Sequence, residues 1–99
     1  MIAYIAGPYR AKTKLGIIRN ILKARKVAKE FWSKGYAVIC PHMNSALRNL
    51  LPEEVFMEGN LEILKKSAVL VVMKGWQKSE GTKREIDFAK KHGIPIIWM

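Results

Sequence analysis

The sequence predicts an α/β protein: a three-layer sandwich on a four-stranded, mainly parallel sheet of the flavodoxin or Rossmann-like type. Three observations predict this class. Short apolar runs alternate along the chain with segments whose apolar residues recur every three or four positions. Glycine directly follows two of the helical segments, at Gly35 and Gly93. The run at 68–73 is continuously apolar and rich in valine, as expected for a strand covered on both faces.

Strands and helices are predicted in strict alternation. The predicted strands cover residues 1–6, 36–40, 68–73 and 94–98, and the predicted helices cover residues 13–34, 52–66 and 80–92. The first helix is indicated by its apolar spacing, and the second by a proline and two acids at its start. Because Pro95 cannot donate to a strand ladder, the last strand should lie at an edge or begin its pairing after the proline.

The strand order is expected to be 2-1-3-4, with the switch point between the first and third strands. Loops at the carboxyl ends of parallel strands meet at one edge of the sheet, where ligands bind. The loop that begins at Gly7 should therefore lie beside the segment 75–85. The segment 42–45 follows the second strand and is expected to face the same crevice.

Chemistry is expected in the segment 75–85, which joins the third strand to the third helix. Ser79 is predicted to be the helix N-cap, Gly81 is a small residue of the turn, and Glu85 falls in the first turns of the helix. The helix dipole favours an ionised carboxylate there and also favours a bound phosphate. From the residues alone, an ordinary first-turn helix acid is the other interpretation of Glu85, and a simple N-cap is the other interpretation of Ser79.

Length and composition predict one domain over residues 1–99, since 49% hydrophobic content argues against disorder. Residues 1–6 read as a strand rather than a signal peptide, and no apolar run approaches the roughly 20 residues that span a bilayer. We therefore expect a cytoplasmic protein without a membrane partner. The two histidines lack metal-ligand spacing and Cys40 is the only cysteine, so no metal site is predicted.

The formal net charge of +10 is distributed unevenly. Nine basic residues and one acid, Glu30, lie between Arg10 and Lys34, whereas four glutamates stand together at positions 53, 54, 58 and 62. A basic surface favours phosphate-bearing ligands, either nucleotides or nucleic acid. A solvated lysine-rich helix face explains the same pattern, and both interpretations stay open.

Four sequence blocks follow one another over nearly the whole chain. They are Tyr-Ile-Ala-Gly-Pro-Tyr-Arg at 4–10, Gly-Tyr-Ala-Val-Ile-Cys-Pro-His at 35–42, Asn-Leu-Glu-Ile-Leu at 60–64, and Gly-Trp-x-x-Ser-x-Gly-x-x-x-Glu at 75–85. In this order and spacing they resemble the nucleoside 2-deoxyribosyltransferase-like superfamily, in particular its small members and its nucleotide N-glycosidase-like variant. The resemblance implies one such domain over residues 1–99.

The resemblance implies that Glu85 is a nucleophile that attacks the anomeric carbon of a nucleoside or nucleotide. Water or a second base would then resolve the glycosyl-enzyme ester, a path that divides one difficult step into two. Gly7, Pro8 and Tyr9 match the first-loop motif of the family, where close backbone approach to the sugar or base is useful. Arg10 is expected to assist a phosphate, and loop packing is the other interpretation of Tyr9.

Ser79 stands where the transferases for free nucleosides have an aspartate and the nucleotide N-glycosidases have a serine. Because a neutral hydroxyl at a helix start suits a phosphate, this position and the basic surface favour a 5′-monophosphate substrate. Gly81 and His42 are expected to bind the substrate too. Trp76 is expected either to stack on the base or to cover the end of the sheet.

Asn60 occupies the position of a family aspartate that is thought to handle protons on the leaving base. An amide can hydrogen-bond a base but cannot supply a proton. Glu58, Glu62 and His42 are candidates for that task, and the spacing selects none of them.

The implied function is cleavage or transfer at the N-glycosidic bond of a nucleoside 5′-monophosphate or nucleoside. Glu85, Asn60 and Tyr9 would be the catalytic residues, without metal or organic cofactor. Relatives complete their sites with residues of a neighbouring subunit, which implies a homodimer or larger homo-oligomer. The alternative is a non-enzymatic nucleotide- or nucleic-acid-binding protein that keeps a relict active site.

Overall fold

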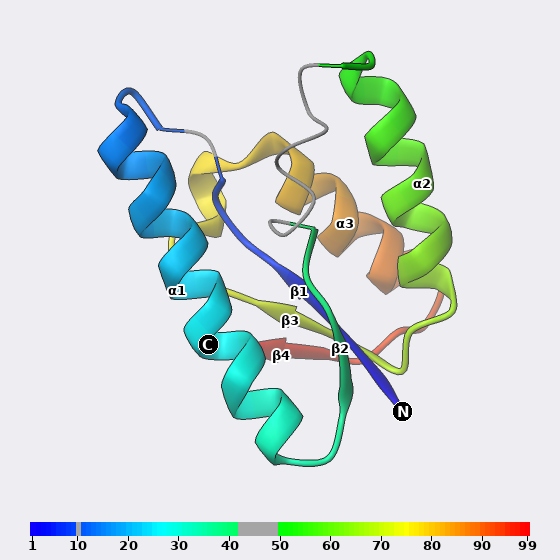
Figure 1. Cartoon of the computed structure of the whole chain (residues 1–99). Helices are drawn as coiled ribbons and strands as arrows, with labels where there is room; N and C mark the ends of the chain where they lie inside the picture. Colours follow the sequence, from blue (N-terminus) through cyan, green and yellow to red (C-terminus); the bar gives the residue numbers. More distant parts are fainter. Residues whose placement is uncertain (10, 42–49) are drawn as a thin grey trace.

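The computed structural model describes residues 1–9, 11–41 and 50–99, which form one parallel sheet flanked by helices. The elements, in chain order, are β1 (Ile2–Ala6), α1 (Lys14–Ser33), β2 (Ala37–Ile39), α2 (Glu53–Lys65), β3 (Val69–Val72), the 3₁₀ turn η2 (Trp76–Lys78), α3 (Glu80–Lys91) and β4 (Ile96–Trp98). Strands lie in the order β2-β1-β3-β4, and each neighbouring pair is parallel (Figure 1). The predicted α/β class and strand order are confirmed.

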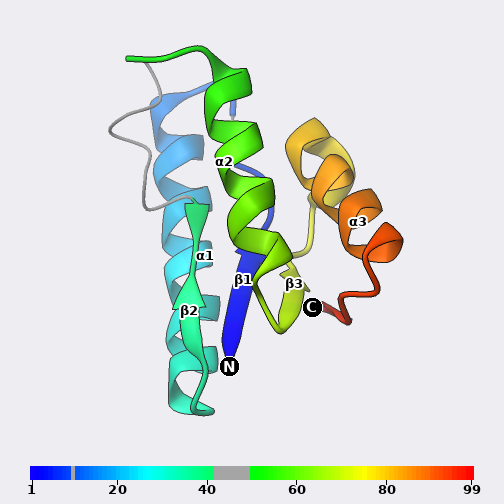
Figure 2. The same cartoon turned by 90° about the vertical axis from the view of Figure 1, so that its right-hand side faces the viewer.

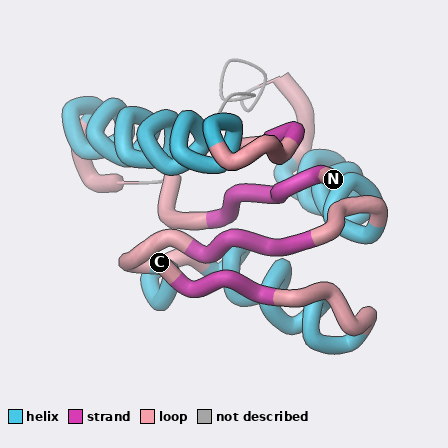
Figure 3. The backbone as a smooth tube through the Cα atoms, turned by 90° about the horizontal axis from the view of Figure 1, so that it is seen from below, coloured by secondary structure: helices cyan, strands magenta, loops and turns pink. Residues whose placement is uncertain are grey.

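The sheet is the middle of three layers. Helix α1 covers one face, and α2 and α3 cover the other (Figure 2, Figure 3). Side chains alternate accordingly: Ala3 and Ile5 of β1 pack in the α1 core, whereas Tyr4 and Ala6 pack in the α2–α3 core. Within the described ranges, none of the helices is long and apolar enough to cross a membrane.

Helix α1 is capped at both ends, and its C-terminal cap at Gly35 is the one that the sequence predicts. The Thr13 side chain caps the start by accepting a backbone N–H bond at 3.0 Å. At the other end Gly35 adopts φ +94, which L side chains rarely do. The N–H of Tyr36 then bonds the Phe31 carbonyl at 3.1 Å, and the two rings pack with centroids 5.6 Å apart. This cap turns the chain from α1 into β2.

Strand β2 is shorter than the predicted 36–40, because Tyr36 belongs to the helix cap and pairing with β1 covers only Ala37–Ile39. Strand β4 satisfies both expectations for a proline-led strand. It lies at the sheet edge, and its paired residues begin at Ile96, after Pro95. The Pro95 carbonyl still accepts a hydrogen bond from the Leu70 N–H at 2.9 Å.

Candidate active site

Two loops meet where β1 and β3 end. The Met73 N–H donates to the Ala6 carbonyl at 2.8 Å, so the strands stay paired up to their carboxyl ends. Gly7 follows at once, and a Cβ built on it would lie 2.7 Å from the Cβ of Met73. Gly75 adopts φ +88, and its own built Cβ would lie 3.4 Å from the Pro8 ring. These glycines let the two loops approach closely, as the predicted topology requires.

A cavity of about 330 Å³ opens beside these loops. It is bounded by the end of β1 and its loop, by one face of α2, and by the start of α3. The described lining residues are Ile5, Ala6, Gly7, Pro8, Tyr9, Pro41, Glu53, Phe56, Met57, Asn60, Lys78, Ser79, Glu80, Gly81, Thr82 and Glu85. The cavity therefore lies at the carboxyl ends of the parallel strands, where α/β sheets bind ligands.

Glu85 is a buried carboxylate in the cavity wall, with 6% of its surface exposed. Helix α3 turns Thr82, Glu85, Ile86 and Ala89 inward, which is the spacing of one helix face. The Tyr4 hydroxyl, fully buried on the facing strand β1, donates a hydrogen bond to Glu85 Oε2. Because a hydrogen bond to a charged group is stronger than a neutral one, this contact holds the carboxylate in a fixed orientation.

The start of α3 is fixed by Ser79, as the sequence predicts. The Ser79 hydroxyl oxygen accepts from the Thr82 N–H at 3.1 Å and from the Thr82 hydroxyl at 2.9 Å. Thr82 is 1% exposed, so this small network is held inside the protein. The first-turn amides of α3 lie beside Ser79 and add the positive end of the helix dipole to the cavity wall.

One face of helix α2 forms the wall of the cavity opposite the start of α3. Glu53, Phe56, Met57 and Asn60 all line the cavity, at the i, i+3, i+4, i+7 spacing of a single helix face. A Cβ built on Gly81 would lie 3.1 Å from the end of the Met57 side chain, so α2 and α3 come close at this point. Asn60 is half-buried and Glu53 is exposed, so the α2 wall runs from the interior to the solvent edge.

Comparison with protein families identifies the chain. A family model described as a domain of unknown function (DUF4406) matches residues 1–98. The chain belongs to this family. No curated protein matches the DUF4406 chain. Since the family description names no activity, the function is argued from the geometry of the cavity.

The cavity of this DUF4406 chain brings together most of the residues that the sequence marks as a site. The predicted residues that line it are Gly7, Pro8, Tyr9, Asn60, Ser79, Gly81 and Glu85. Asn20 Nδ2 donates to the Tyr9 carbonyl at 3.1 Å, which ties the first loop to α1. Arg10 and His42 lie outside the described residues. Trp76 is not among the described lining residues; its ring packs against Trp98 with centroids 5.5 Å apart.

Tyr4, Thr82 and Glu53 are among the residues at the DUF4406 site that have no role in the sequence-based prediction. Tyr4 reads as a core aromatic in an apolar strand, although its phenol is the one hydroxyl on residues 1–6. Thr82 sits within the helix start and its contact with Ser79 appears only when the helix folds. Glu53 reads as a first-turn helix acid, and its place on the cavity depends on how α2 packs. Among the described residues, no group of three His, Cys, Asp or Glu side chains is arranged to hold a metal ion.

Proposed function

We propose that this DUF4406 protein cleaves or transfers the N-glycosidic bond of a nucleoside 5′-monophosphate or nucleoside, through a covalent intermediate on Glu85. One observation carries the proposal: a buried carboxylate, held by the Tyr4 hydroxyl, lines a cavity of about 330 Å³ at the carboxyl ends of a parallel sheet. Burying a carboxylate costs free energy unless hydrogen bonds offset the cost or the group takes part in the chemistry of a site. An ordinary helix acid would therefore be expected at the surface.

The chemistry follows from that placement. The Glu85 carboxylate attacks the anomeric carbon, the bond from that carbon to the base breaks, and the base leaves with the bonding electron pair. The positive charge that develops on the sugar in the transition state is stabilised by the same carboxylate. Water, or the nitrogen of a second base, then attacks the anomeric carbon and releases Glu85.

The start of α3 supports a phosphate on the substrate. Ser79 accepts two hydrogen bonds from Thr82, so its own hydroxyl hydrogen is directed elsewhere. Beside it, the first-turn amides and Gly81 offer donors without a bulky side chain. Lys78 also lines the cavity and adds a positive charge. We therefore favour a 5′-monophosphate over a free nucleoside.

We also propose that the protein acts in the cytoplasm as a homo-oligomer. The resemblance to enzymes with shared sites supports the homo-oligomer, and so does the surface of α1, where Leu15 and Leu22 are 73% and 55% exposed. Sedimentation velocity over a range of protein concentrations tests the oligomeric state. A single species at monomer mass at all concentrations would contradict the proposed homo-oligomer.

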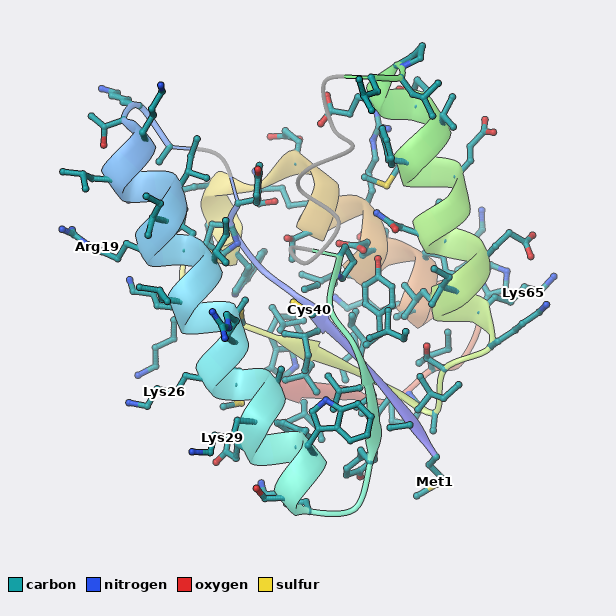
Figure 4. The ribbon with its side chains drawn as sticks, in the orientation of Figure 1. Met1, Arg19, Lys26, Lys29, Cys40 and Lys65 are labelled. Atoms are coloured by element: carbon teal, nitrogen blue, oxygen red, sulfur yellow. The ribbon has the colours of Figure 1, made fainter. Side chains whose placement is uncertain are left out.

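A rival function is favoured by the charge on α1. Its described basic residues are all exposed, and Figure 4 shows Arg19, Lys26 and Lys29 projecting from the helix. Such a face is typical of proteins that bind nucleic acid through its phosphates. The protein would then bind a polynucleotide without chemistry, and the amide of Asn60 agrees with this reading because it cannot supply a proton.

The two functions are separated by one experiment with Glu85→Ala. The protein is incubated with a panel of ribo- and deoxyribonucleoside 5′-monophosphates and the corresponding nucleosides, and free base is measured by chromatography. We expect base release by the wild type, a loss of at least about 100-fold in Glu85→Ala, and no loss in Asp87→Ala, an exposed acid on the same helix. Absence of base release, with salt-sensitive polynucleotide binding that Glu85→Ala leaves unchanged, would support the rival.

A further inference from the structure

Helix α1 presents an exposed stripe that combines apolar and basic side chains. Ile18, Leu22, Arg25 and Lys29 are all exposed and lie three or four residues apart, so they share the outer face of the helix. The helix carries six basic residues and one acid. Among the residues that the structure describes, no carboxylate forms an ion pair with any of the six. The stripe therefore offers apolar surface and unpaired positive charge to a partner.

A stripe of the opposite charge runs along α2. Leu51, just before the helix, and Val55, Glu58 and Glu62 within it are exposed and have the same spacing as the α1 stripe. They lie on the side of α2 that faces away from the cavity. In the described ranges neither Glu58 nor Glu62 has a cation as ion-pair partner. Two apolar residues followed by two charges thus occur on both helices, with positive charges on α1 and negative charges on α2.

The arrangement of the two helices allows these stripes to meet between copies of the chain. Helices α1 and α2 cover opposite faces of the sheet, and both run in the same direction because each connects parallel strands (Figure 1). A second copy placed beside the first without rotation brings its α2 alongside α1 of the first, with the two helices parallel. In the register that pairs Leu22 with Val55, the bases three and seven residues later on α1 fall opposite the acids three and seven residues later on α2.

We infer that the stripe of α1 binds the stripe of α2 on a second copy of this chain. The inference rests on the homo-oligomer of the proposed function and names the two surfaces that form it. The contact joins unlike surfaces head to tail, so it builds a ring where successive copies close on one another and an open chain where they do not. Ion pairs at the contact fix the register, and the apolar residues bury surface that each single copy exposes to water.

Other partners explain less of the two stripes. Contact between α1 and α1 of a second copy would place basic residues against basic residues, and like charges across an interface are unfavourable. A polynucleotide would pair its phosphates with the basic side chains. It would leave Ile18 and Leu22 exposed to water and would give the acidic stripe no role. Only the contact between α1 and α2 uses the apolar residues and both sets of charges.

Two charge-reversed variants test the contact. Arg25→Glu combined with Lys29→Glu makes both stripes negative, whereas Glu58→Lys combined with Glu62→Lys makes both stripes positive. We expect each variant alone to sediment as a monomer at concentrations where the wild type assembles. An equimolar mixture of the two variants should regain assembled species, because each negative stripe of one variant then meets a positive stripe of the other.

Controls exclude a general effect of charge and a failure to fold. Lys90→Glu combined with Lys91→Glu, two exposed residues at the end of α3, changes the net charge as much as the α1 variant does and should assemble like the wild type. Should a reversed variant fail to fold by circular dichroism, the milder Arg25→Gln combined with Lys29→Gln takes its place. It should raise the dissociation constant of the assembly by about tenfold or more.

The possible results separate this inference from the proposed function. Assembly of both reversed variants alone would overturn the contact between the stripes and leave the homo-oligomer standing, and a mixture that stays monomeric would also overturn the contact. A wild type that is monomeric at all concentrations would overturn both the contact and the homo-oligomer, whereas base release that depends on Glu85 would stand. A monomeric wild type that binds a polynucleotide, with binding lost in the α1 variant, would assign the α1 stripe to nucleic acid.

Discussion

Tyr4 and Glu85 join two elements that are remote in sequence and adjacent in space. Tyr4 is fully buried on β1, and its hydroxyl donates to a carboxylate that α3 turns inward. Hydrogen bonds to a charged group contribute about 1.5–3 kcal/mol, more than a neutral pair. The contact therefore has two effects, which are to stabilise the packing of α3 on the sheet and to orient the proposed nucleophile.

Tyr4→Phe separates these effects, because it removes the hydroxyl and leaves the ring. We expect the free energy of unfolding to fall by about 1–3 kcal/mol, since a buried carboxylate loses a donor. Base release should fall more than substrate affinity, because orientation acts on the reacting atoms. Urea denaturation and steady-state kinetics measure the two effects. In a Glu85→Gln background the stability cost should shrink, and an undiminished cost would show that the hydroxyl acts on something else.

Gly7 and Gly59 make a matched pair of glycine substitutions. A Cβ on Gly7 would meet Met73 Cβ at 2.7 Å, so Gly7→Ala must push β1 and β3 apart at the cavity. We expect a loss of about 1–3 kcal/mol in the free energy of unfolding. Gly59 lies inside α2, and outside the backbone of that helix no atom of the described residues lies within 4 Å of a built Cβ, so Gly59→Ala should gain about 0.5–1 kcal/mol. Urea midpoints that move in the same direction would contradict this account of the loop.

At the scale of elements, a comparison of two helix N-caps separates a purely structural cap from one that also binds substrate. Ser79 caps α3 at the cavity, and Thr13 caps α1 away from it. Either residue changed to Ala should lose about 0.5–2 kcal/mol of stability. Only Ser79→Ala should also raise the KM for a 5′-monophosphate, because only its hydroxyl faces the proposed phosphate. A raised KM in Thr13→Ala as well would assign both changes to general destabilisation.

Element ends were predictable where a local residue fixes them. Gly35 and Gly93 both adopt positive φ and end their helices, and Ser79 caps its helix as predicted, because these are short-range interactions. The length of a strand, in contrast, is not determined by short-range interactions. Among the described strands, β2 pairs with β1 alone, so its length depends on a partner distant in sequence. The sequence pattern at 36–40 could not reveal this.

The sequence could predict the part of the candidate site that the strand order alone brings together. Parallel strands put their carboxyl ends at one edge, so Gly7 and Glu85 could be brought together without knowing any packing. Tyr4 and Glu53 required more, since the hydrogen bond of Tyr4 to Glu85 and the place of Glu53 on the cavity depend on how one element packs on another. Trp76 had two interpretations before the fold was known, and its contact with Trp98 puts its ring at the end of the sheet.

At the scale of the whole molecule, the net charge of +10 makes stability sensitive to salt. Like charges crowd along α1, where Lys23, Lys26 and Lys29 are all exposed. We expect the thermal midpoint to rise as salt is raised toward about 0.5 M, because screening weakens repulsion between exposed charges. Lys26→Glu combined with Lys29→Glu should raise the midpoint at low salt, and the gain should shrink at high salt. A gain that is independent of salt would assign the effect to something other than charge.

The central claim, a sugar bonded to Glu85 during the reaction, is tested most directly by the mass of the intact protein. The wild type is mixed with a 5′-monophosphate that it cleaves, quenched in acid within milliseconds to seconds, and weighed by mass spectrometry. We predict a mass increase equal to the sugar phosphate without its base, located on the peptide that contains Glu85, and none in Glu85→Gln. Base release at full rate by Glu85→Gln, or an adduct on another residue, would contradict the account.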